Sequence, residues 1–293
     1  MSLLQRLETQ LPKIVVAPTF VCALLFIYGF ILWNAYLSFT PSRMLPNYEF
    51  VGLIQYQTLF ENERWWTALF NLGIFSFLFV SIALVIGLLL AILLDQKIRG
   101  EGWIRSIYLY PMALSFIVTG TAWKWMLNPG LGLEKMVRDW GFADFTFDWL
   151  VNPEKSIYTV VIAAVWQSSG FVMALFLSGL RSIDDSIIKA AQIDGASMPR
   201  IYARIIIPSL MPVFISVIMI LTHIAVKSFD LVMALTGGGP GFSSDLPATF
   251  MYSFSFTRNQ IGVGAASAMI MLMMMAAVIV PLMYSDLRRS KGT

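Results

Sequence analysis

Six long apolar stretches dominate this sequence, and each has the length of a membrane helix. A helix needs about 20 mostly apolar residues to cross the roughly 30 Å hydrocarbon core of a bilayer. The stretches cover residues 14–39, 67–94, 104–126, 157–180, 206–229 and 262–285. We therefore expect an all-α membrane protein with six transmembrane helices, organised as a single transmembrane domain over residues 1–293.

The composition supports a membrane protein and argues against several other classes. Hydrophobic residues make up 58% of the chain and charged residues 13%, whereas about a quarter of the residues in soluble domains are charged. A net charge of +3 is too small to indicate a nucleic-acid partner. The single histidine and the single cysteine, Cys22, leave no His or Cys cluster for a metal and no internal disulfide. The glycine-rich "TGGGPG" at 236–241 lacks the lysine of a phosphate-binding loop and is expected to form a tight turn.

The distribution of Lys and Arg predicts that both termini are cytoplasmic, because basic residues are enriched on the cytoplasmic side of membrane proteins. With that orientation, twelve basic residues are cytoplasmic: Arg6, Lys13, Lys97, Arg99, Arg105, Arg181, Lys189, Arg200, Arg204, Arg288, Arg289 and Lys291. Six basic residues lie in the longer outer loops: Arg43, Arg64, Lys135, Arg138, Lys155 and Arg258.

Carboxylates are almost absent from the central thirds of the six spans. Carriers driven by protons or ions usually place titratable groups at that depth, because a proton relay needs them there. We therefore expect the energy for any transport to come from another protein.

A polar segment, "KAAQIDGAS" at 189–197, interrupts the apolar pattern between the fourth and fifth spans. Residues 183–194 can form three helical turns, which place Ile183, Ile187, Ala190 and Ala191 on one side. Gly195 can then end the helix. Two interpretations are open: an amphipathic loop, or a helix presented to a partner protein.

The longer segment "KAAQIDGASMPRIYARIIIPSL" resembles the EAA motif of ABC importer permeases. The matching positions are Ala190, Ala191, Asp194, Gly195, Ala196 and Pro208. Lys189 departs from the motif, because the family usually has glutamate there. "LTGGGPG" at 235–241 is similar to the segment after the penultimate span in maltose- and glycerol-phosphate-type permeases.

The resemblance implies a type I ABC importer permease in a bacterial inner membrane, with residues 181–205 as the coupling loop. Its partners would be a second homologous permease, two copies of a cytoplasmic ATPase and an extracytoplasmic solute-binding protein. A pair of identical permeases is the less usual alternative. ATP and Mg²⁺ would bind the ATPase, and this chain would bind no cofactor. The expected coupling residues are Ile183, Ile187, Lys189, Ala190, Ala191, Asp194, Gly195 and Ala196.

Polar groups at membrane depth identify a candidate solute path, because they are costly there unless they face a partner or a cavity. In the fourth span the candidates are Trp166, Gln167, Ser168 and Phe171, and in the fifth they are Thr222, His223 and Lys227. The family places its sugar pocket on these two helices, and aromatic faces with neutral donors suit sugar hydroxyls. Hydrogen bonding between helices is the alternative role for each polar residue.

These features predict a sugar importer subunit, with a glucose-type monosaccharide or small glucoside as the preferred substrate. A glycerol-3-phosphate-type permease is the nearest alternative, although the interiors of the spans have no arginine for a phosphate. A channel or secondary carrier that works alone is the alternative from another class. A membrane enzyme would need a catalytic constellation that this sequence does not contain.

Overall fold

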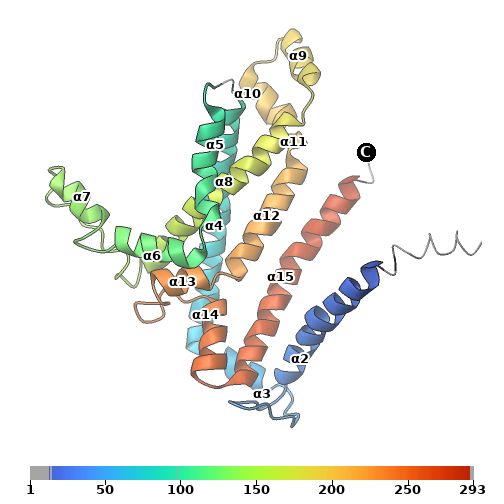
Figure 1. The fold of residues 1–293 in the computed structure, drawn as a ribbon, viewed down its shortest axis with the longest axis vertical. Coiled ribbons are helices and arrows are strands. Elements are labelled where there is room, and N and C mark those ends of the chain that lie inside the picture. The colour runs from blue at the N-terminus through green and yellow to red at the C-terminus, as the bar shows by residue number, and fades with distance from the viewer. Residues whose placement is uncertain (1–12, 14, 97, 291–293) are drawn as a thin grey trace, which may run out of the picture. The chain divides into compact units, whose positions relative to one another are not determined.

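The computed structural model describes residue 13, residues 15–96 and residues 98–290, and every regular element in these ranges is a helix (Figure 1). Residue 14, where the first span was expected to begin, lies outside the described residues, as do Arg6, Lys97, Lys291 and the side chain of Arg289. The described chain divides into two compact units. One contains residues up to 62 together with 251–270, and the other contains residues 63–250 together with those from 271 onward.

The smaller unit is built around the first apolar stretch. A π-helical turn, η1 (Leu24–Tyr28), leads into α2 (Gly29–Leu37), and α3 (Ile54–Phe60) follows after a loop. The unit also contains η4 (Ser253–Thr257) and the start of α15 (Ile261–Ser290). Gly262 donates its backbone N–H to Ser42 O at 2.9 Å. A Cβ on Gly262 would lie 2.4 Å from Thr40 O, so only glycine permits this approach.

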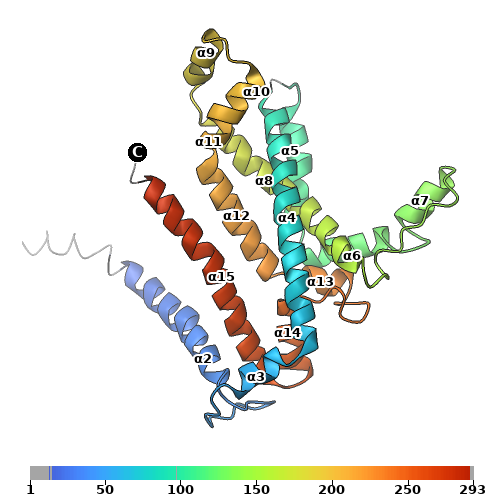
Figure 2. The ribbon, with the colours of Figure 1, turned by 180° about the vertical axis from the view of Figure 1, so that it is seen from behind.

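In the larger unit, α4 (Glu63–Asp95) and α8 (Ser156–Arg181) pack along each other and form most of the core (Figures 1 and 2). A small residue permits their close approach, since a Cβ on Gly87 would lie 2.4 Å from the Val172 side chain. α12 (Met211–Val226) packs against both helices, and the Phe176 and Phe214 rings meet edge to face at 4.6 Å.

The third expected span, 104–126, is broken into two short helices. α5 (Glu101–Leu109) continues into a 3₁₀ turn, η2 (Tyr110–Ala113), and α6 (Phe116–Met126) starts after an extended residue, Leu114. Pro111 explains the break, because proline lacks an amide hydrogen and disrupts helix interiors. Ser115 then caps α6 by accepting a hydrogen bond from the Val118 N–H.

The fifth expected span, 206–229, is bent. α10 (Met198–Ile201), η3 (Tyr202–Ile206) and α11 (Ile207–Ser209) run as one helical segment that meets α12 at 63°. Pro208 and Pro212 flank the bend at Leu210, as expected for two residues that each remove a helix hydrogen bond. Two short helices, α13 (Asp230–Leu235) and α14 (Pro247–Tyr252), follow.

Four continuous helices in the described residues are long and apolar enough to cross a membrane, and the bent pair makes five. The four are Val15–Leu37, Glu63–Asp95, Ser156–Arg181 and Ile261–Ser285. Each coincides with one of the expected spans. The helical prediction is therefore confirmed, and the segment 104–126 differs from the expectation by being divided rather than continuous.

Candidate functional site

The polar segment between the fourth and fifth spans contains a well-capped helix, α9 (Asp185–Ile193), at one end of the larger unit (Figure 1). Asp184 is its N-cap, and its Oδ1 accepts the Ser186 N–H at 2.8 Å. Hydrogen bonds from Ser186 to the carboxylate lower the pKa of Asp184. The helix therefore begins at Asp185, two residues later than the start of the expected helical segment 183–194.

The C-terminus of α9 is closed by a Schellman motif. Gly195 has a φ of +80°, its N–H bonds to Gln192 O, and the Ala196 N–H bonds to Ala191 O, both at 3.0 Å. This explains the glycine in the motif, because a residue with a Cβ is strained at that φ. Asp194 is exposed at the C-cap, where it makes no contribution to helix capping through its side chain.

The apolar side chains of the α9 region divide between two faces. Ile183 and Ala191, together with Ile188 and Ala196, pack against the core of the larger unit. Ile187 and Ile193 point away from that core, with 48% and 86% of their surfaces exposed. Lys189 and Ala190 are exposed as well.

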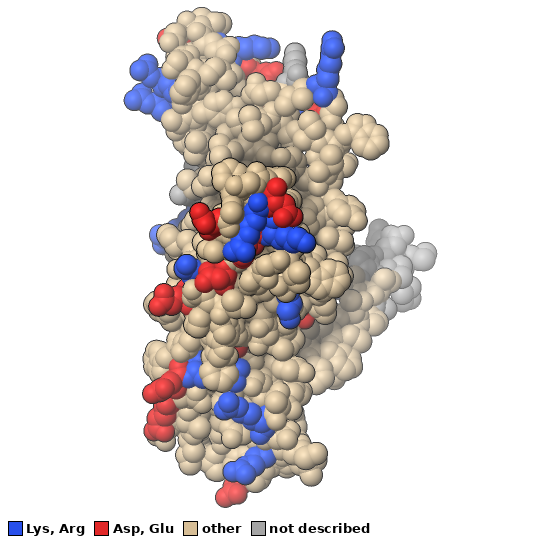
Figure 3. Space-filling model, turned by 90° about the vertical axis from the view of Figure 1, so that its left-hand side faces the viewer, with Lys and Arg blue, Asp and Glu red and all other residues tan. Residues whose placement is uncertain are grey.

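The expected docking set of Ile183, Ile187, Ala190 and Ala191 is therefore split between the two faces. Sequence reasoning missed Ile193, although its isolation between polar neighbours was a usable signal. Figure 3 shows several Lys and Arg side chains at the end of the larger unit that carries α9 and α10, and others over the rest of that face.

An arginine at the end of α8, shortly before α9, joins the ends of three helices. Arg181, the last residue of α8, lies 2.9 Å from Glu101 Oε1 and 3.7 Å from Asp95 Oδ1. Its guanidinium also approaches Leu94 O at 3.5 Å. The hydrogen bond from Arg181 lowers the pKa of Glu101. The ends of α4, α5 and α8 are thus held together beside the segment that leads into α9.

The four candidate solute residues of α8 have different surroundings. Gln167 is 4% exposed and donates from Nε2 to Leu114 O at 2.8 Å, which satisfies the carbonyl left open by the break before α6. Its Oε1 has no hydrogen-bond partner among the described residues. Ser168 is buried, Phe171 is half-buried, and Trp166 is 39% exposed.

The candidates of α12 lie beside a separate small cavity. His223 and Lys227 line a pocket of about 180 Å³ together with Phe116 of α6 and Asp230 of α13. Thr222 and the four α8 candidates do not line it. The cavity offers an ammonium, an imidazole, a carboxylate and an aromatic ring, which are groups that can bind a polar solute.

The loop 236–246 is fixed to α4 by buried polar contacts. Asn71 donates from Nδ2 to Ser243 O and Asp245 O, both at 3.0 Å, and Arg64 pairs with Asp245. Gly237, Gly238 and Gly241 all have positive φ values. The expected tight turn is present. The short helix α13 lies between it and α12.

The long apolar helices, the capped polar segment and the small polar cavity are features of a multi-pass membrane protein. The chain belongs to the family of binding-protein-dependent transport system inner membrane components, whose model matches residues 83–290. The permease resemblance in the sequence is thereby confirmed.

Two curated relatives cover most of the chain. A probable ABC transporter permease protein of Pyrococcus horikoshii is 41% identical over 251 residues, which are 84% of this chain and 86% of the relative. The xylose/arabinose import permease protein XacH of Haloferax volcanii is 39% identical over 236 residues, 79% of this chain and 74% of the relative.

A solved structure has the same fold. It is a bacterial ABC transporter involved in the import of the acidic polysaccharide alginate, and one of its chains matches with a TM-score of 0.84 at 19% identity. The match covers 98% of both chains. At this level of identity the likeness shows the fold alone.

Proposed function

We propose that this chain is the permease subunit of an ATP-driven sugar importer in a bacterial inner membrane. The helix α9 is the main support for this proposal. It is capped and exposes Ile187 and Ile193. It follows Arg181, which joins the ends of three membrane helices. A partner that pulls on this face moves α4, α5 and α8 together, because Arg181 links their ends.

In the proposed orientation both termini and the coupling loop 181–205 are cytoplasmic, and the chain forms one permease domain with six spans. The broken α5–η2–α6 segment serves as the third span and the bent α10–α12 segment as the fifth. The partners are a second permease of the same family, two ATPase subunits that bind ATP and Mg²⁺, and an extracytoplasmic solute-binding protein. This chain supplies the path and no catalytic group.

A sugar substrate is favoured by a relative that imports xylose and arabinose and by the ring of Phe116 beside polar groups in the α12 cavity. Among sugars we retain a glucose-type monosaccharide or small glucoside. Lys227 and His223 also suit a phosphate ester, so glycerol 3-phosphate is the second candidate. The solute contacts we propose are Trp166, Phe171, His223 and Lys227, with Gln167, Ser168 and Thr222 supporting them.

Uptake by proteoliposomes tests this function. The purified permease pair with its ATPase and binding protein should accumulate radiolabelled sugar only with ATP, and unlabelled glycerol 3-phosphate should not compete. Uptake by this chain alone without ATP would contradict the proposal and favour a channel or secondary carrier. Competition by glycerol 3-phosphate but not by sugars would identify the alternative substrate.

A further inference from the structure

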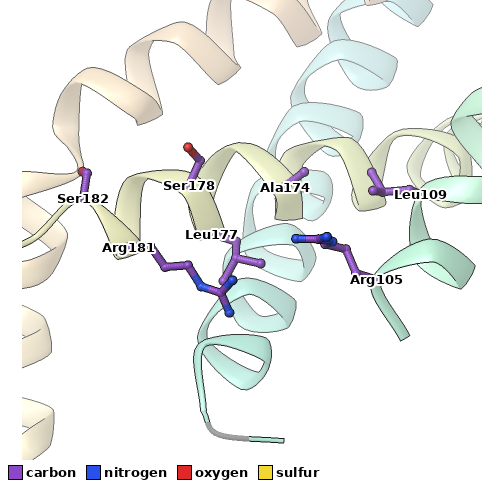
Figure 4. Close-up of a pocket in the computed structure, with 7 residues that line it drawn as sticks. All are labelled: Arg105, Leu109, Ala174, Leu177, Ser178, Arg181 and Ser182. Carbon is purple, nitrogen blue, oxygen red and sulfur yellow. The ribbon is translucent and has the colours of Figure 1, made fainter. Parts of the chain in front are cut away.

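A groove of about 550 Å³ lies between α5 and α8 at the end of the larger unit that carries α9 (Figure 4). On α8 it is lined by Ala174, Ser178 and Arg181, and on α5 by Arg105 and Leu109. Figure 4 shows the Arg105 side chain reaching from α5 toward α8 across this groove. None of these residues belongs to the candidate solute set.

The lining differs in chemistry from the outer surfaces of the same bundle. On the other side of α5 two large apolar side chains are exposed, Trp103 at 81% and Ile107 at 68%. Exposed residues in the middle of α4 are apolar too, including Phe77, Val85 and Leu89. These surfaces suit lipid chains, whereas the groove presents a charge and a hydroxyl.

Arg105 is the guanidinium in the groove that makes no direct ion pair with a described residue. Its side chain is exposed. Arg181 pairs with Glu101 and Asp95, and Glu101 also attracts Arg105 from one helical turn away. An unpaired arginine against lipid chains is costly, and such residues usually face a water-filled cavity or a partner.

The groove also continues the α8 face on which a candidate solute residue lies. Phe171 precedes Ala174 by three positions and Ser178 by seven, so the three share one side of the helix. A solute that leaves Phe171 toward the α9 end therefore meets the groove next.

We propose that this groove is a water-filled vestibule through which solute leaves on the α9 side, and that Arg105 gives it a positive potential. The vestibule thus passes neutral and anionic solutes and disfavours cations. This inference rests on the proposed transport function and on its orientation.

Cysteine accessibility tests the vestibule directly, because Cys22 is the only cysteine in the sequence. In a Cys22→Ser background, Ser178→Cys is exposed to charged, membrane-impermeant thiosulfonate reagents in inside-out vesicles containing the full transporter. The matched control is Leu89→Cys, whose side chain lies on α4 and is 55% exposed. We expect Ser178→Cys to be labelled and Leu89→Cys to remain unlabelled.

The charge of the reagent tests Arg105. Relative to a free thiol in solution, Ser178→Cys should favour an anionic sulfonate reagent over a cationic trimethylammonium reagent. Adding Arg105→Gln should reduce that preference about fivefold, as expected for one charge at roughly 8 Å in a watery site. An unchanged preference would refute the role of Arg105.

Two outcomes overturn the vestibule itself. If Ser178→Cys and a second variant, Ala174→Cys, are labelled as slowly as Leu89→Cys, the groove is covered by lipid or by another subunit. If ATP-driven sugar uptake persists in these variants, only the vestibule fails. If uptake never depends on ATP while labelling proceeds, the proposed function fails instead.

Discussion

Arg64 and Asp245 lie 181 positions apart, yet Arg64 Nε lies 2.6 Å from Asp245 Oδ2. Their side chains are 13% and 1% exposed. The guanidinium lies over the Phe242 ring at 4.2 Å, and the second carboxylate oxygen accepts the Thr249 hydroxyl. This pair fixes the loop before α14 to the first turn of α4.

We therefore expect Asp245→Asn to destabilise the protein by about 3 kcal/mol, because removing one partner leaves a buried charge uncompensated. The melting temperature of the detergent-purified protein measures the loss. Glu63→Gln is the matched control, since Glu63 is exposed on the same turn. Equal melting temperatures for the two variants would contradict this account.

Gly170→Ala should prevent normal packing of the fourth span. A Cβ at Gly170 would lie 1.8 Å from Tyr108 O, which is a backbone atom and cannot be moved by a side-chain rotation. We expect a large drop in the yield of folded protein on size-exclusion chromatography. Gly73→Ala in α4, where nothing lies within 4 Å of the added Cβ, should be recovered like the parent; similar yields for both would show that α8 can shift.

The two faces of α9 should separate coupling from stability. Ile187→Ser changes an exposed side chain and should lower transport-linked ATPase activity without lowering the melting temperature. Ile188→Ser changes a side chain packed against the core and should lose about 1 kcal/mol of stability. Both are measured in the assembled transporter, and the reverse pattern would mean that the other face of α9 meets the partner.

Lys189→Glu restores the family's usual charge at an exposed position of α9. We expect unchanged membrane insertion and an altered ratio of ATP hydrolysed to sugar transported, because the side chain belongs to the proposed coupling surface. Unchanged transport and ATPase stimulation would mean that Lys189 is only a solvated surface charge with no role in coupling. The charge-neutral Lys189→Gln separates loss of the lysine from gain of a carboxylate.

The ion pair between Glu101 and Arg181 should stabilise the protein at neutral pH and should lose this effect only at acidic pH. Because the pKa of Glu101 is lowered, its charged form is favoured in the folded protein. The ion pair therefore contributes to stability at pH values above the ordinary pKa of 4.5, and this contribution is lost as the pH falls through the lowered pKa. Glu101→Gln should therefore melt below the parent at pH 7. The difference should vanish at pH values well below 4.5, and a difference that persists there would exclude the carboxylate as its source.

The apolar length of the spans was sufficient to predict four continuous helices, because bilayer thickness fixes the length of an apolar run. The break at Leu114 could not be placed from the sequence, although Pro111 was visible there. Proline disturbs a helix, but whether the helix bends or divides depends on which neighbour receives the freed carbonyl. Here that neighbour is Gln167, 53 residues away.

The candidate site was predicted in part. Helical spacing grouped Ile183 with Ile187, whereas the structure separates them because residue 183 precedes the Asp184 cap and packs against the core. His223 and Lys227, two of the candidates in the fifth span, line the same cavity. Phe116 and Arg105 could not be predicted as site residues from the sequence, because their positions depend on how α5 and α6 are arranged on either side of the break.

The hydrogen bond from Gln167 to Leu114 O also has a consequence for how the chain is made. Neither α5, with 9 residues, nor α6, with 11, is long enough to cross a bilayer by itself. The Leu114 carbonyl receives its side-chain partner only after residue 167 has been synthesised. The segment 101–126 therefore completes its hydrogen bonding only after residue 167 has been made, and a ribosome stalled before that residue leaves the Leu114 carbonyl without this partner.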